Sequence, residues 1–227
     1  MSVRLFDESV TSTILVQCRK RIRLRPPKFA ASIAFAGTTL VVTAMSYGPS
    51  GWRRAAERLA IYHAGDLAHG RMWRLPMSAF LAQSWAQLVW TLLLAATAVL
   101  ALEALTGTIR VAIVLGAAHL GPTLLVAAWA QWTADQQLLT TADYGTSCVV
   151  MGAAAGLASA LRSRTIVALI VAAFCVDVWI NAPYTIIEHL MSVILGAALV
   201  QLPAPAARTA PGRSAPPAPA RSPKPRR

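Results

Sequence analysis

Residues 109–130 read IRVAIVLGAAHLGPTLLVAAWA, and their only charged side chain, Arg110, stands at the start. A transmembrane helix needs about 17–25 predominantly apolar residues, so this stretch predicts a helix that crosses a membrane. Five further apolar stretches flank it, at 29–47, 86–104, 146–161, 165–181 and 184–202. The block 146–181 is too long for one crossing, and we divide it at Arg162 and Arg164. The sequence therefore predicts an all-α membrane protein, a bundle of six transmembrane helices.

The composition agrees with a membrane protein. Of 227 residues, 56% are hydrophobic and 13% are charged, whereas a soluble domain carries about 25% charged residues. These figures exclude a soluble globular enzyme, a disordered chain and a disulfide scaffold. The three cysteines, Cys18, Cys148 and Cys175, are too few and too scattered for a disulfide framework or a zinc site. We expect no metal and no other cofactor.

Charge divides the chain into three parts and orients it. They are a basic N-terminal segment (1–28), the membrane domain (29–202) and a Pro/Arg-rich tail (203–227) that we expect to be disordered. Six spans place sixteen of the 21 Lys and Arg residues on one side, which the positive-inside rule makes cytoplasmic. We expect a multi-pass protein of the cell (plasma) membrane with both termini cytoplasmic and attracted to anionic lipid. The basic clusters lack the aromatic pattern of nucleic-acid binding, so no nucleic-acid partner is predicted.

The loop 48–85, between the first two spans, mixes tryptophan and tyrosine with arginine. Such side chains favour the membrane interface, so we expect short amphipathic helices on or in the outer leaflet. His63, Asp66 and His69 follow one another at intervals of three residues in this loop. On a helix they would spread over too wide an arc for a tight metal site.

Ser147 and His189 are the leading candidates for chemistry. Ser147 lies in the first turn of the predicted fourth span and His189 about five residues into the sixth, so both belong in the outer half at similar depth. A histidine within a membrane span is costly and usually faces a cavity or a partner. A Ser–His pair is the minimum for an activated nucleophile. The alternative is structural, with the serine bonded to its own backbone and the histidine joining helices.

Small residues predict that these two spans pack closely. Gly152 and Gly156 form a GxxxG pattern, and Ser192 and Gly196 follow His189 on its own helix face. Close packing of the two helices would bring His189 near Ser147.

At these residues the chain resembles the rhomboid family, over about 30–202. The first loop and second helix are similar in Trp73-Arg74, Phe80-Leu81, Leu88 and the Glu-x-x-x-Gly of Glu103 and Gly107. Gly145-Thr146-Ser147 matches the start of the family's Gly-x-Ser-Gly motif, and His189, Ser192 and Gly196 match its last-helix motif. The runs 118–121 (AHLG) and 143–147 (DYGTS) look closer to an actinobacterial rhomboid-like branch.

The resemblance implies an intramembrane serine protease that cleaves transmembrane helices which unwind near their outer end. Ser147 would be the nucleophile and His189 its general base, in a water-filled cavity open to the outer side. Where the family has a His-x-x-x-Asn motif that supplies oxyanion donors, this chain has Gln87 and Thr91, which can still donate hydrogen bonds.

Two other functions stay open. Cys148 replaces the glycine after the serine, and Met151 replaces an aromatic residue. Together with Gln87 and Thr91, these departures suit an inactive rhomboid-fold protein that binds transmembrane clients. A small transporter or membrane assembly factor would use His119 and Asp177 as a polar pathway, although a role in helix packing or a kink is the default for His119.

Three acidic side chains have structural alternatives. Asp177 or Glu188 could polarise His189, but we favour a carboxylate at the membrane interface for Asp177, since charges near span ends are tolerated. Glu103 lies near the inner end of the second span, where we expect it to meet Arg110 or the interface.

Overall fold

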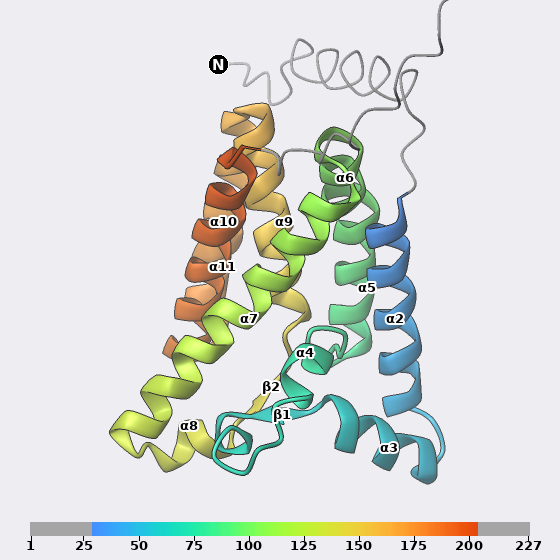
Figure 1. The fold of residues 1–227 in the computed structure, drawn as a ribbon, viewed down its shortest axis with the longest axis vertical. Helices are drawn as coiled ribbons and strands as arrows, with labels where there is room; N and C mark the ends of the chain where they lie inside the picture. The colour runs from blue at the N-terminus through green and yellow to red at the C-terminus, as the bar shows by residue number, and fades with distance from the viewer. Residues whose placement is uncertain (1–28, 204–227) are drawn as a thin grey trace, which may run out of the picture.

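The computed structural model describes residues 29–203. The predictions for the basic N-terminal segment and for the tail from 204 onward lie outside the described residues. The described chain is helical apart from its connections and one small sheet, in which β1 (Tyr62–His63) pairs antiparallel with β2 (Ala142–Asp143) (Figure 1).

Three helical segments are long and apolar enough to cross a membrane: Trp85–Thr106, Thr108–Thr133 and Pro183–Gln201. The first is continuous through α5 (Trp85–Leu94), a π-helical turn η2 (Ala95–Val99) and α6 (Leu100–Thr106); the others are α7 and α11. Helices α2 (Ala30–Ser46), α9 (Thr146–Leu161) and α10 (Arg164–Ile180) cover the other predicted spans and are shorter. The chain is thus an α-helical protein with the composition of a membrane protein.

The long helices run side by side, and the short elements gather at one end of the bundle (Figure 1). These short elements are α3 (Ser50–Ala60), η1 (Ala64–Asp66), α4 (Arg74–Ser78), α8 (Gln136–Thr140) and the sheet. Helices α9 and α11 both begin at this end, whereas α2 begins and α11 ends at the opposite one. This end of the bundle, which holds the β-sheet, is called the sheet end below.

Helices α7, α9 and α11 meet through small residues. A methyl group on Gly196 would overlap the backbone of Gly152, and one on Gly152 would overlap the Ala118 side chain of α7. The Ser192 hydroxyl lies 2.6 Å from the Ala118 carbonyl oxygen, and Gly156 packs against Val200 and the carbonyl of Gly196. Backbone therefore touches backbone where α9 crosses α11.

Glu103 joins three elements at the end opposite the sheet. Its buried carboxylate accepts hydrogen bonds from the Ala31 N–H (3.1 Å), the Ser32 N–H (2.8 Å) and hydroxyl (2.5 Å), and the Thr108 hydroxyl (2.6 Å). The first N–H groups of a helix lack intrahelical acceptors, and a carboxylate satisfies them at the start of α2. Gly107 has a φ of 90°, which permits the sharp turn from α6 into α7.

The expectation that Glu103 meets Arg110 or the interface was wrong. Arg110 donates to the carbonyl oxygen of Leu202 at 2.7 Å, beyond the end of α11. The last carbonyl groups of a helix lack intrahelical donors, so a cation is stabilising there. Each charge is satisfied by the free backbone groups of a helix end.

The loop 48–85 folds around Asp66. The buried Asp66 carboxylate accepts from the His63 N–H at 3.0 Å and from the Arg74 guanidinium at 3.2 Å. His69 instead contacts the Gly65 carbonyl. Among residues 29–203, no group of three or more His, Cys, Asp or Glu side chains could hold a metal ion. Trp73, the residue before Arg74, is 53% exposed.

The contact between α9 and α11 predicts a steric effect on stability. Gly196→Ala places a methyl group on the Gly152 backbone, and overpacking of this kind costs about 1–3 kcal/mol. Gly37→Ala is the matched control, since a methyl group there meets nothing within 4 Å and should gain about 1 kcal/mol of helix propensity. Thermal unfolding in detergent should show a lower Tm for Gly196→Ala alone. Equal Tm values for the two variants would contradict this contact.

Asp66 predicts a pH dependence. Burial alone would raise the pKa of Asp66, but the His63 N–H and the Arg74 guanidinium outweigh it, so the pKa lies below its ordinary value. Because the pKa of Asp66 is lower in the folded than in the unfolded protein, its ionisation stabilises the fold. This stabilisation is fully present above the unfolded-state pKa of about 3.9 and is lost as the pH falls through the folded-state pKa. Asp66→Asn should lower the Tm at pH 7, and its difference from the parent should shrink as the pH falls below about 4 toward the folded-state pKa. A difference that stays constant down to pH 3 would refute the pairing.

Candidate active site

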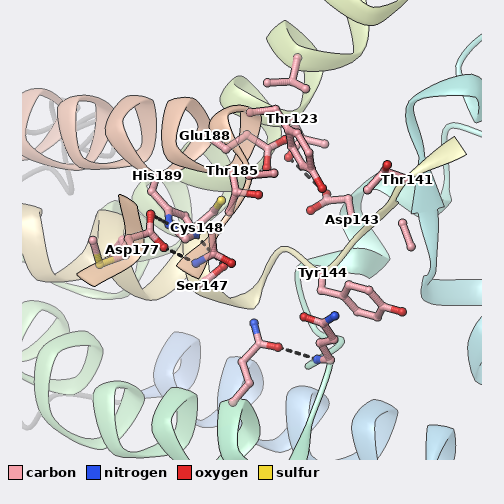
Figure 2. A pocket seen from close by; sticks show the side chains of 18 of the residues that line it. Thr123, Thr141, Asp143, Tyr144, Ser147, Cys148, Asp177, Thr185, Glu188 and His189 are labelled. Atoms are coloured by element: carbon pink, nitrogen blue, oxygen red, sulfur yellow. Dashed lines mark hydrogen bonds and ion pairs between the residues drawn. The ribbon is translucent and has the colours of Figure 1, made fainter. Parts of the chain in front are cut away.

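A cavity of about 720 Å³, lined by both polar and apolar side chains, opens at the sheet end of the bundle, and Ser147, Asp177 and His189 line it (Figure 2). Its walls also include side chains of α5, α7, α8 and the connection that leads into α9. Serine, histidine and aspartate from three helices therefore share one cavity.

Ser147 and His189 lie in direct contact, as the predicted packing of their helices requires. The Ser147 Oγ is 2.8 Å from Nε2 of His189. Ser147 is half-buried in the first turn of α9, and His189 is 6% exposed in the second turn of α11. The hydroxyl is thus open to the cavity, while the imidazole that faces it is held by protein on its other sides.

Asp177 completes a Ser–His–Asp arrangement. Its Oδ2 lies 2.7 Å from Nδ1 of His189, and its Oδ1 accepts from the Asn181 side-chain amide at 2.6 Å. A neutral histidine that donates from Nδ1 presents Nε2 as an acceptor, which is the state that can take a proton from Ser147. The three groups form a continuous relay from carboxylate to hydroxyl.

Our preferred interpretation of Asp177 as an interface carboxylate was wrong. Asp177 is 8% exposed and is the only buried residue of α10, whereas Val176, Val178 and Trp179 beside it are 59%, 54% and 90% exposed. Helix α10 turns its polar side chain inward and its apolar side chains outward. Glu188 makes no hydrogen bond to His189, since adjacent residues on a helix point about 100° apart.

Gly145 and His119 set the position of Ser147. The Gly145 N–H donates to the Ser78 carbonyl at 3.0 Å, and a side chain at Gly145 would overlap the His119 ring. The His119 Nε2 lies 2.7 Å from the Leu75 carbonyl and 3.0 Å from the Ser78 hydroxyl. His119 therefore joins α7 to α4 beneath the turn into α9. It lines a separate apolar cavity, whereas Asp177 lines the cavity beside Ser147, so the two predicted pathway residues of a transporter line different cavities.

Candidate donors for a developing oxyanion line the same cavity as Ser147 or belong to the first turn of α9. Gln87 and Thr91 both line the cavity. The Gln87 Oε1 accepts from the Gln83 N–H at 2.6 Å, which leaves the Gln87 amide nitrogen as a donor. The N–H groups of Ser147 and Cys148 belong to the first turn of α9, where N–H groups have no intrahelical acceptor.

Sequence reasoning overlooked these backbone donors and Asn181. Asn181 follows Asp177 by four residues, a spacing that places two side chains on one helix face and is the signal that could have identified it. Cys148 is buried and Met151 lines the cavity, so both departures from the rhomboid pattern are accommodated beside the serine.

No protein-family model, curated protein or solved structure matches the chain. The chemistry of the site therefore rests on its geometry, which is that of an activated serine nucleophile with an imidazole base and a carboxylate that orients it.

This geometry predicts covalent labelling by a fluorophosphonate probe at Ser147. Labelling should be lost in Ser147→Ala and His189→Ala. In Asp177→Asn it should slow by about 10²–10⁴-fold, because the wrong imidazole tautomer is then favoured. Ser46→Ala is the control, since that hydroxyl bonds the Thr43 carbonyl of its own helix. Labelling that persists in Ser147→Ala would show that another nucleophile reacts.

Proposed function

We propose that this protein is an intramembrane serine protease of the rhomboid type, which cleaves transmembrane helices of other proteins. The observation that carries the proposal is the Ser147–His189–Asp177 relay, with contacts of 2.8 and 2.7 Å, in a cavity inside a bundle of apolar helices. A hydrolytic relay in such a setting suits a substrate that itself arrives through the lipid.

The proposed reaction is acyl transfer to serine followed by hydrolysis. The Ser147 Oγ attacks the scissile carbonyl carbon while His189 Nε2 takes the hydroxyl proton. The new oxyanion is stabilised by the Gln87 side chain and the Ser147 and Cys148 N–H groups. His189 then protonates the leaving amine. Water, deprotonated by His189, releases the acid and regenerates the serine.

Asp177 has an electrostatic task in this scheme. The imidazole becomes an imidazolium in both tetrahedral steps, and a carboxylate 2.7 Å from its Nδ1 stabilises that charge in a site shielded from water. Asn181 holds the second carboxylate oxygen at 2.6 Å, which fixes the orientation of Asp177.

In the proposed topology α2, α5–α6, α7, α9, α10 and α11 are the six spans, and both termini face the cytoplasm of the cell. Supporting this, α2 begins and α11 ends at the same end of the bundle (Figure 1). The cavity lies at the opposite end, beside the aromatic and basic residues of 48–85. The site would then open toward the outer face of the plasma membrane.

Substrate access through the bilayer has a structural basis. The cavity is lined by Trp90 and Leu94 of α5 and by Ala173 and Ile180 of α10. Ile180 is 73% exposed and Trp90 60% exposed, and their apolar surfaces would face lipid. A transmembrane helix could therefore present its outer end to Ser147 from the side.

Cleavage of a reporter tests the proposal. Full-length protein in liposomes should cut a single-span reporter that carries helix-breaking Gly or Pro residues near its outer end. Ser147→Ala and His189→Ala should abolish cleavage, and Asp177→Asn should reduce kcat by about 10²-fold or more. His69→Ala, which changes an exposed histidine of the loop, is the control for histidine loss.

The alternative function has its own outcome. Folded protein that binds the reporter but neither cuts it nor reacts with a fluorophosphonate would be a client-binding rhomboid-fold protein. That result would overturn the protease proposal.

A further inference from the structure

The cavity has a second group of polar side chains, apart from the serine relay. Asp143 and Glu188 lie together with Thr123 at one side, while Ser147, His189 and Asp177 lie at another (Figure 2). Glu188 is 6% exposed and points into the cavity, and its carboxyl oxygens have no hydrogen-bond partner among the described residues. A carboxyl group buried to this extent without a protein partner is costly unless water or a ligand in the cavity meets it.

Asp143 and Tyr62 line the same cavity as Glu188. The Asp143 Oδ2 has only long contacts, 3.4 Å to the Ser78 hydroxyl and 3.5 Å to the Thr123 hydroxyl. Burial raises the pKa of Asp143. The Tyr62 hydroxyl is buried with no partner, and burial together with the charge of Asp143 raises the pKa of Tyr62 to about 12, so it remains a neutral phenol.

Charge balance indicates which ligand would fit. The whole chain carries a net charge of +12, yet the described residues that line the cavity include no Lys or Arg. Its one lining histidine, His189, is bonded to Asp177 and Ser147. Two carboxyl groups that face one space disfavour each other's ionisation, and an organic cation between them would reverse that effect.

We propose that Asp143 and Glu188 form a specificity subsite that binds an arginine or lysine side chain of the substrate. The inference rests on the proposed protease function and names its substrate class. A guanidinium group presents five N–H donors in a planar fork that matches carboxylate oxygens. A basic residue at the outer end of a transmembrane helix would place its charge in this subsite as the adjoining backbone reaches Ser147.

A binding measurement tests the subsite without requiring catalysis. Benzamidine, an aryl amidinium, is the probe, and neutral benzamide of the same shape is its control. Benzamidine should raise the Tm of the full-length protein in detergent in a concentration-dependent way, and benzamide should not. Glu188→Gln and Asp143→Asn should each weaken benzamidine binding about tenfold or more, whereas Glu57→Gln, which removes a carboxylate paired with Arg53 on α3, should not. Equal binding by all variants would overturn the proposal.

Cleavage of matched reporters supplies the second arm. Reporters that differ only in Arg, Lys, Gln or Leu at successive positions near the outer end should show about 10–100-fold higher kcat/KM for the basic residues at one position. Glu188→Gln and Asp143→Asn should remove that preference while fluorophosphonate labelling of Ser147 persists, which shows that the variants are folded.

The two arms separate this inference from the protease proposal. Benzamidine binding that depends on Glu188, without cleavage of any reporter, would support the cation site and overturn the protease. Cleavage with no preference for basic residues and no benzamidine binding would support the protease and overturn the subsite.

Discussion

The contact between the backbones of Gly152 and Gly196 positions the rest of the site. A side chain at Gly196 would push α9 and α11 apart. The 2.8 Å contact between Ser147 and His189 requires that these two helices stay close together. Both residues lie one to two turns from the glycines toward the sheet end, so a small change in helix spacing becomes a lost hydrogen bond. Close packing through small residues is thus the condition for the chemistry.

The second constraint is the cost of polar groups inside an apolar bundle. Glu103 is satisfied by the first N–H groups of α2, His119 by the carbonyl of Leu75 and the hydroxyl of Ser78, and Asp177 by His189 and Asn181. Glu188 is not satisfied in this way, and its carboxyl group lies in the same cavity as the serine. A carboxyl group without a protein partner that lines a cavity is satisfied by water or by a ligand.

Several particular features of the fold were predictable because they depend on local pattern. The apolar run 109–130 falls within α7 (Thr108–Thr133), and the shared depth of Ser147 and His189 follows from where α9 and α11 begin. The environments of charged residues were not predictable in the same way. Asp177 and Arg110 both lie near helix ends, where an interfacial position and a buried partner look alike in sequence. Only the partners in the folded chain distinguish them: the His189 side chain for Asp177, and the Leu202 carbonyl oxygen for Arg110.

The sequence by itself determined the helices, their apolar character and the pair of residues that could react, because hydrophobic runs and small-residue spacing act within one helix at a time. Tertiary structure decided that Asp177 turns inward to His189, that Glu103 binds the start of α2, and that Asp143 of β2 joins Glu188 of α11 in one cavity. These contacts join residues from different elements, and the rotation of each helix about its axis fixes them. The packing of each helix against its neighbours sets that rotation. The pattern of a single stretch of sequence does not specify these neighbours.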